Sequence, residues 1–227
     1  SVFQELNAAS PTPFACYFKA YDKHILSASP ERFLAKRNQQ LISQPIKGTS
    51  ACAASPQQDE YQKNLLKNSI KEQAENVMIV DLVRNDLTKS AVPGTVAVEE
   101  LFGIYSFKQV HQLISTVTAT LDAAIDVVDA VKNTFPPGSM TGAPKLKAMQ
   151  LMEQFEVSKR SIYAGSVGYF SPDGDFDFNV VIRTILYNAA QKYLSFQVGS
   201  AITFQSKPAA EYDECLLKAS AMMRVLN

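Results

Sequence analysis

Two pairs of carboxylates in this sequence have the spacing of a metal site. Glu72 and Glu75 lie three residues apart, and Glu211 and Glu214 repeat that spacing near the end of the chain. On a helix, this separation puts both carboxylates of a pair on one face. If the two helices faced each other, four carboxylates would surround one point, which suits Mg²⁺. The alternative is that each pair belongs to an ordinary solvated helix face.

A second constellation joins an acid to an amine. Segments 32–35 and 41–46 predict a β-hairpin with a three- or five-residue loop, in a register that puts Glu31 directly opposite Lys47. Such a pair can supply an acid together with a nucleophile or base. The flanking Pro45 and Gly48 favour a functional role, because proline is disfavoured inside a ladder and glycine lets the backbone approach a ligand. The alternative is a surface ion pair worth under ~1 kcal/mol.

Two further features suit the binding of an anion. The Gly-rich segment 138–145 (GSMTGAPK) opens a predicted helix, so its backbone N–H groups can cradle a carboxylate, although such loops also serve only as caps. Arg183 lies between apolar neighbours in a predicted strand. A buried arginine needs an acidic partner, which is either a substrate carboxylate or Asp177.

The elements that must position these groups alternate between short strands and amphipathic helices. Apolar residues at spacings of three and four predict one long helix over 59–83, and a second good helix over 143–156 has Pro144 in its first turn. Short connections between strands make the sheets antiparallel, and no βαβ repetition appears, so the fold class is α+β. The other predicted helices are 123–133 and 208–226, and the predicted strands are 14–20, 24–29, 32–35, 41–46, 95–101, 106–121, 166–171, 176–187 and 192–204.

Composition excludes several classes of protein. The 227 residues carry 22 basic and 22 acidic side chains, and this balance disfavours a nucleic-acid binder. No apolar stretch reaches the ~20 residues of a membrane helix. The cysteines form no CxxC pair and the two histidines are isolated, so we expect reduced thiols in a cytoplasmic protein, structural histidines and no zinc site. These residues are Cys16, Cys52, Cys215, His24 and His111.

Seven motifs in one order give these features a common meaning. They are SPERF at 29–33, PIKGT at 45–49, AEN at 74–76 leading into MIVDLVRND at 78–86, PGSMTGAPK at 137–145, YAGSVGY at 163–169, IRT at 182–184 and EYDE at 211–214. Their order resembles that of the chorismate-utilising enzymes, the family of anthranilate, aminodeoxychorismate, isochorismate and salicylate synthases. The resemblance implies two antiparallel sheets packed together, helices outside, and Mg²⁺-dependent replacement chemistry on chorismate. It also implies that residues 1–227 are the C-terminal portion of a complete chorismate-binding catalytic domain.

The resemblance also assigns roles to individual residues. Lys47 matches a nucleophile that attacks C2 of chorismate, and Glu31 matches the acid that protonates the departing C4 hydroxyl. Glu75 and Glu214 match direct Mg²⁺ ligands, whereas Glu72 and Glu211 match residues that reach the metal through water. The remaining matches are to substrate-binding positions: Gly48, Thr49, Ser139, Tyr163, Arg183, Gly199, Ala201 and Lys218.

Within the family, Lys47 is the most informative position. Aminodeoxychorismate synthases carry Pro-Ile-Lys-Gly-Thr there, whereas anthranilate synthases carry alanine in place of the lysine. The resemblance therefore implies amination of chorismate at C4 through a covalent lysine adduct. No glutaminase sequence is present, so ammonia is expected from a glutamine amidotransferase subunit or from solution. The alternatives are an anthranilate or isochorismate synthase, or a catalytically silent chorismate- or tryptophan-binding paralogue.

This sequence departs from the family pattern at three positions. Gln112 stands where relatives have a histidine, Ala201 replaces the second glycine of a Gly-x-Gly, and Gln205 replaces a frequent aspartate. The methyl group of Ala201 adds bulk near the expected carboxylate. These departures bear on rate and substrate fit more than on the fold.

Overall fold

The computed structural model describes residues 1–108, 110–204 and 206–226, so Gln205 lies outside the described residues. The chain forms two compact units, each assembled from separated segments. Unit 1 consists of Ser1–Pro30, Arg160–Gly165 and Asn179–Asn227, and unit 2 consists of Glu31–Lys159 and Ser166–Phe178. The α+β class and the two antiparallel sheets predicted from the sequence are confirmed.

Unit 1 contains a four-stranded sheet in the order β1-β2-β10-β11. The first hairpin forms as predicted, with Phe18 opposite Ile25, and its turn places Tyr21 at a φ of 52°. The third strand, β10, adds antiparallel to β2, with Ile185 opposite Leu26. The strands are β1 (Phe14–Ala20), β2 (Lys23–Ser29), β10 (Thr184–Asn188) and β11 (Tyr193–Phe196).

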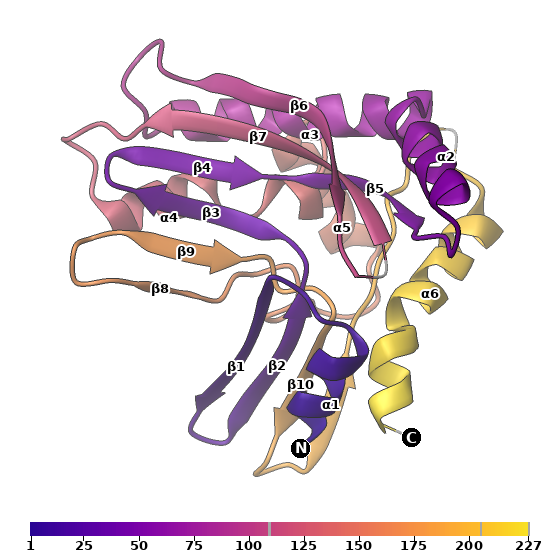
Figure 1. Cartoon of the computed structure of the whole chain (residues 1–227). Helices are drawn as coiled ribbons and strands as arrows, with labels where there is room; N and C mark the ends of the chain where they lie inside the picture. The colour runs from indigo at the N-terminus through magenta and orange to yellow at the C-terminus, as the bar shows by residue number, and fades with distance from the viewer. Residues whose placement is uncertain (109, 205, 227) are drawn as a thin grey trace. The chain divides into compact units, whose positions relative to one another are not determined.

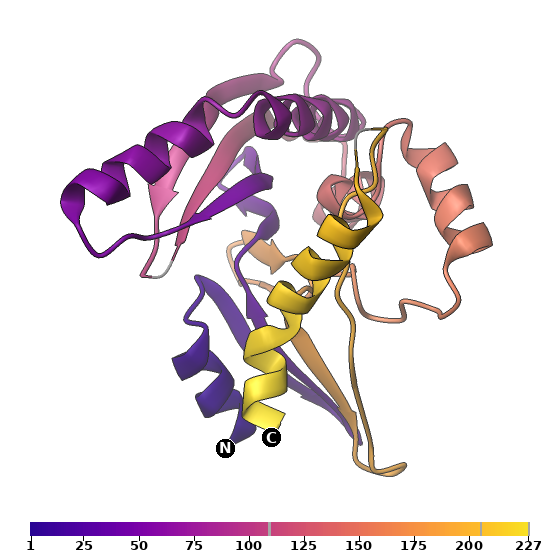
Figure 2. The same ribbon diagram turned by 90° about the vertical axis from the view of Figure 1, so that its right-hand side faces the viewer.

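Two helices from the ends of the chain complete unit 1. Helix α6 spans Pro208–Leu226, as predicted, and α1 spans Val2–Ala9, which the sequence analysis did not predict. Figure 2 shows these two helices side by side. Leu6 and Met222 are fully buried against Ile185 and neighbouring apolar residues of the sheet. A capping box at Ser1 fixes the start of α1. A helix of only eight residues is not stable on its own, so α1 depends on this cap and on its packing against the sheet.

Unit 2 is built on a larger sheet of seven strands in the described part of the chain, ordered β5-β7-β4-β3-β9-β8 with β6 on the other side of β7. Figure 1 shows helix α3 running along one face of this sheet. The helix buries Ile79, Val83 and Leu87 there. The strands are β3 (Arg32–Arg37), β4 (Gln40–Gln44), β5 (Ile46–Ala51), β6 (Ala97–Ser106), β7 (Val110–Thr120), β8 (Gly168–Phe170) and β9 (Phe176–Asn179).

The predicted register between β3 and β4 is wrong. The turn is only two residues long, because Asn38 adopts a φ of 54° and allows Arg37 to pair with Gln40. A further shift follows between Arg32 and Ala35, so that Arg32 pairs with Gln44. Lys47 falls beyond the end of β4, in a strand that pairs with β7. Glu31 and Lys47 are therefore not cross-strand partners.

The single helix predicted over 59–83 is two helices. Helix α2 spans Pro56–Lys67 and α3 spans Ile70–Thr88. The helix is interrupted at Ser69, which is the N-cap of α3. Its backbone is extended, and its hydroxyl accepts a hydrogen bond from the Glu72 N–H. The remaining helices of unit 2 are α4 (Val127–Thr134), the 3₁₀ turn η1 (Gly138–Met140) and α5 (Lys145–Phe155), which begins after Pro144 rather than before it.

The strand predicted over 176–187 is also interrupted. It divides into β9 and β10, which belong to different sheets, and residues 180–183 are in neither. The strand predicted over 192–204 ends at Phe196. In the described residues, no helix combines the length and the apolarity needed to cross a bilayer.

Candidate active site

The sequence-predicted site residues divide between the two units. Unit 2 holds Glu31, Lys47, Gly48, Thr49, Glu72, Glu75 and Ser139, and unit 1 holds Tyr163, Arg183, Gly199, Ala201, Glu211, Glu214 and Lys218. Each group has an internal geometry of its own. We call them the lysine group and the arginine group.

A β-bulge positions Lys47 in the lysine group. Ile46 pairs with Ile114 and Thr49 pairs with Gln112, so β5 contains one more residue than β7 across this stretch. Lys47 and Gly48 therefore lie together opposite a single residue of β7 and form the bulge. Gly48 has a φ of 86°. A bulge of this kind turns a side chain away from the regular alternation of the strand.

Gly48 also brings the bulge into close contact with the acidic helix α3. A Cβ added at Gly48 would lie 3.0 Å from Glu72 Oε2, 3.2 Å from Glu72 Cβ and 2.9 Å from Leu66 Cδ1. Only glycine fits both this backbone conformation and this space. The strand that carries Lys47 therefore runs directly beside the helix that carries the first carboxylate pair.

Glu72 and Glu75 lie on a helix, as the sequence predicted, but in the first two turns of α3 rather than in the middle of a longer helix. Both are partly buried, and the Glu75 side chain is 14% exposed. Lys71 Nζ lies 3.9 Å from Glu75 Oε1. The N-terminal end of a helix favours negative charge, and two carboxylates one turn apart can offer oxygen ligands to a divalent cation.

Glu31 is buried to 6% exposure immediately before β3. Ser139 lies in the 3₁₀ turn η1, which packs on α3 through Gly138. Thr49 is exposed in β5, opposite Gln112. The side-chain oxygen of Gln112 is buried with no hydrogen-bond partner in the described residues.

A contact that the sequence analysis missed joins the first residue of α5 to α3 and to the segment that precedes η1. Lys145 Nζ donates to Asp86 Oδ2 at 2.6 Å, and also to the carbonyls of Thr134 and Pro136. Asp86 is 5% exposed and also accepts from Lys89 at 2.9 Å. Burial lowers the pKa of Lys145, and Asp86 opposes that shift. The signal was present in the sequence, since Asp86 ends MIVDLVRND and Lys145 ends PGSMTGAPK, but pairing across 59 residues has no local pattern.

The arginine group is centred on Lys218 and the second carboxylate pair, both on α6. Lys218 Nζ donates to the carbonyl of Gly199 at 2.9 Å and lies 2.6 Å from Glu214 Oε1. Glu211 is buried, and the hydroxyl of Ser200 donates to its Oε2. These contacts tie the loop after β11 to the helix. Glu211, Glu214, Lys218 and Gly199 are thus brought together.

Arg183 lies outside the strand that was predicted to contain it. It sits just before β10 with a φ of 53° and is partly buried. Burial lowers the pKa of its guanidinium, and the negative charge of Glu214 raises it. The alternative partner, Asp177, instead accepts from Arg32 at 3.0 Å and from Arg37 at 2.6 Å. The structure records no ion pair for Arg183 among the described residues, so the ion pair with Asp177 is wrong.

Tyr163 completes this group. Its hydroxyl would lie 3.0 Å from a Cβ placed on Gly199, so the absence of a side chain there makes room for it. The guanidinium carbon of Arg160 lies 5.8 Å from the centre of its ring. Ala201 follows in the same loop, and its carbonyl accepts from the hydroxyl of Ser206 at 3.3 Å. The arginine group thus combines two carboxylates with the cationic side chains of Arg183 and Lys218 and the phenol of Tyr163. Such a combination can bind an anion together with a metal ion.

The expectation that His111 is isolated is wrong. Its Nε2 lies 2.8 Å from Asp59 Oδ1, and Cys52, Asp59 and His111 form one cluster of metal-ligating groups. The spacing of residues in the sequence does not predict this cluster, because Cys52 follows β5, Asp59 lies in α2 and His111 lies in β7. The cysteines Cys16, Cys52 and Cys215 are free thiols.

Comparisons with known proteins define the class to which this fold and these residues belong. Residues 1–224 match the family described as chorismate binding enzyme, and the chain belongs to that family. It is 45% identical, over its whole length, to a probable chloroplastic aminodeoxychorismate synthase of Oryza sativa subsp. japonica and covers 25% of that protein. It is 42% identical over 99% of its length to aminodeoxychorismate synthase component 1 of Salmonella typhimurium and covers 49% of it.

Solved structures agree on the family fold. Anthranilate synthase component I from Streptococcus pneumoniae aligns with a TM-score of 0.87 and 31% identity, over 97% of this chain and 48% of that one. The isochorismate synthase MenF from Escherichia coli aligns with a TM-score of 0.83 at 24% identity, over 98% of this chain and 52% of that one, and supports the fold alone. The chain spans about half the length, or less, of the relatives it matches.

Proposed function

We propose that this chain carries the catalytic residues for amination of chorismate at C4, giving 4-amino-4-deoxychorismate. The relatives at 42–45% identity, which are named as aminodeoxychorismate synthases, support this choice. The observation that carries the proposal is the bulge of β5, where Lys47 is followed by Gly48 in close contact with Glu72. An amine is thereby held on the strand that packs against the proposed metal helix.

In the proposed reaction, Lys47 and Glu31 share the first step. The amine of Lys47, in its unprotonated form, attacks C2, both conjugated ring double bonds shift by one position, and the C4–O bond breaks. Glu31 gives a proton to the departing hydroxyl, which leaves as water, and the positively charged lysine nitrogen loses a proton. Ammonia then forms a bond at C4 and loses a proton, the two double bonds shift back, and the bond between C2 and the lysine nitrogen breaks as that nitrogen regains a proton. Atoms balance as chorismate plus ammonia giving product plus water.

The four glutamates would hold Mg²⁺ in this proposal. Glu75 and Glu214 would be direct ligands, and Glu72 and Glu211 would act through water. Their oxygen donors fit a hard divalent cation, and Glu211 and the Glu75 side chain are largely withdrawn from solvent. When bound, the ion would neutralise the ring carboxylate of chorismate.

The other predicted residues would bind the substrate. Arg183 and Tyr163 would hold the enolpyruvyl carboxylate, a role that suits an arginine with no recorded protein ion pair among the described residues. The further substrate contacts would come from Gly48, Thr49, Ser139, Gly199, Ala201 and Lys218.

Residues 1–227 would form a chorismate-binding catalytic domain, as the C-terminal portion of a longer one, supplied with ammonia by a glutamine amidotransferase subunit. The word "component 1" in the name of the Salmonella relative implies a second component for that protein. The three free thiols fit a reducing compartment such as the cytoplasm.

The similarity to an anthranilate synthase component I at 31% identity makes that activity the competing proposal. The proposed amination and anthranilate synthesis differ in their product and in whether they require Lys47. We would incubate the protein with chorismate, ammonium and Mg²⁺ and identify the product by chromatography. We expect 4-amino-4-deoxychorismate, and we expect Lys47→Ala to abolish it. Anthranilate with pyruvate as the main product would overturn the proposal, and tight binding without turnover would favour a silent paralogue.

A further inference from the structure

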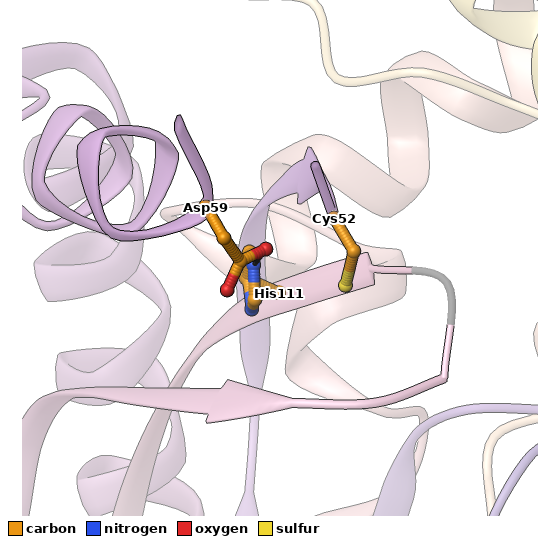
Figure 3. Close-up of side chains that lie close together, drawn as sticks. All are labelled: Cys52, Asp59 and His111. Atoms are coloured by element: carbon orange, nitrogen blue, oxygen red, sulfur yellow. Dashed lines mark hydrogen bonds and ion pairs between the residues drawn. The ribbon is translucent and has the colours of Figure 1, made fainter. Parts of the chain in front are cut away.

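A cluster in unit 2 has no part in the proposed amination. Figure 3 shows Cys52, Asp59 and His111 with their side chains pointing toward one another. Cys52 follows β5, Asp59 lies in the first turn of α2, and His111 lies in β7. The sulfur, one ring nitrogen and one carboxylate oxygen all lie within 4.8 Å of one another.

The hydrogen bonds of His111 fix its ring in the cluster. Its Nε2 faces Asp59 Oδ1 at 2.8 Å, and its Nδ1 faces the hydroxyl of Ser106, also at 2.8 Å. The imidazole is only 1% exposed. A hydroxyl can donate to or accept from Nδ1, so Ser106 supports either tautomer of the ring. A histidine that ligates a metal needs this kind of support on its other nitrogen.

Asp59 is ready to act as a ligand. Its Oδ1 accepts from the Ala53 N–H at 3.0 Å and faces His111 Nε2 at 2.8 Å, and these contacts hold the carboxyl group in the cluster. The Lys63 ammonium opposes the binding of a cation, because it lies 2.9 Å from Asp59 Oδ2. Glu60 Oε2 is already 3.8 Å from the same ammonium, and offers it another partner.

We propose that Cys52, Asp59 and His111 bind a transition-metal ion of the Zn²⁺ type, through the thiolate sulfur, a carboxylate oxygen and Nε2. Thiolate and imidazole are ligands that Zn²⁺ prefers and Mg²⁺ does not, so this site is chemically distinct from the four glutamates. Three protein ligands leave a fourth position for water. Binding breaks the S–H bond of Cys52 and releases its proton to solvent. The ring proton of His111 then resides on Nδ1 and is donated to Ser106 Oγ, which frees Nε2, and two bonds to the ion replace the contact between His111 and Asp59.

The ion would join three elements. Cys52 follows the strand that carries Lys47, Asp59 lies in the first turn of α2, the helix before α3, and His111 adjoins Gln112, the partner of Thr49. We therefore expect metal binding to raise the melting temperature of the protein. The proposal does not rest on the amination of chorismate, because its test contains no substrate.

Cobalt is the best probe, since Co²⁺ bound to a thiolate gives an intense near-ultraviolet charge-transfer band. We would strip the full 227-residue chain with a chelator, add Mg²⁺ in excess to occupy any oxygen site, and titrate with Co²⁺. We expect the band to appear and saturate at one equivalent, with about one proton released per ion. Zn²⁺ should then displace the band.

Variants assign the band to this cluster. Cys52→Ser should abolish the band, whereas the matched control Cys215→Ser should retain it. Ser106→Ala should weaken Co²⁺ binding about tenfold to a hundredfold, because it removes the support of the imidazole. Lys63→Gln should tighten binding at low salt. Circular dichroism on each variant shows that it folds. Absence of the band in the unmodified chain, or its retention in Cys52→Ser, would overturn the proposal.

Discussion

Replacing Gly48 by alanine tests how the bulge of β5 fits against α3. A non-glycine residue with a positive φ costs about 1–2 kcal/mol. The new methyl group would also lie 2.9 Å from Leu66 Cδ1 and 3.2 Å from Glu72 Cβ. The leucine methyl can rotate away, but Glu72 Cβ is attached directly to the helix backbone. Overpacking of this kind adds about 1–3 kcal/mol, so Gly48→Ala should lower the free energy of unfolding by about 2–5 kcal/mol.

Gly94 supplies the matched control. Its φ is 81°, and a Cβ there would meet nothing within 4 Å. Gly94→Ala should therefore show the backbone cost alone, about 1–2 kcal/mol. Urea unfolding followed by circular dichroism measures both variants as shifts in midpoint at an unchanged slope. Gly48→Ala should also raise the Mg²⁺ concentration needed for activity, because it displaces Glu72. Equal losses of stability in the two variants would show that the close contact with Glu72 is not real.

Three other predictions follow from single contacts. Lys145→Met should lower the free energy of unfolding by about 3 kcal/mol in urea titration, because buried Asp86 loses a partner, whereas exposed Lys147→Met should change it little. Asp59 has a pKa below its ordinary value of 3.8, so its contribution to stability is complete above that pH and is lost as the pH falls further. Asp59→Asn should accordingly flatten the acid side of a plot of melting temperature against pH, and an unchanged slope would contradict the cause assigned. Burial raises the pKa of the Cys16 thiol, so iodoacetamide should label it more slowly than free cysteine, as peptide mass spectrometry can measure.

Local patterns in the sequence predicted most of the elements but not their interruptions. The hairpin from Phe14 to Ser29 and the helix from Pro208 to Leu226 are as expected, because each follows from periodicity and turn residues. The break at Ser69 was missed, since the apolar spacing continues through it and only an N-cap hydrogen bond ends the helix. The break before Thr184 was missed for a similar reason, because alternation of side chains continues through a residue with positive φ.

In the candidate site, too, local spacing predicted some features, whereas features that depend on register and tertiary packing were missed. Spacing placed Glu72 with Glu75 and Glu211 with Glu214 on helices, and resemblance to the family selected Lys218, Gly199 and Tyr163, which the structure brings together. The direct pairing of Glu31 with Lys47 was wrong, because turn length and bulges change register without a strong sequence signal. Contacts between distant segments, such as Lys145 with Asp86 or His111 with Asp59, depend on tertiary packing and were not predictable from spacing.

The most direct test of the proposed chemistry is whether Lys47 becomes covalently attached to the substrate ring. The protein would be incubated with chorismate and Mg²⁺ without ammonia, quenched in acid, and analysed by intact and peptide mass spectrometry. We expect an adduct with the mass of chorismate less one water on the peptide that contains Lys47, and we expect that adduct to disappear when ammonium is added. Turnover to 4-amino-4-deoxychorismate with no adduct, undiminished in Lys47→Ala, would contradict it.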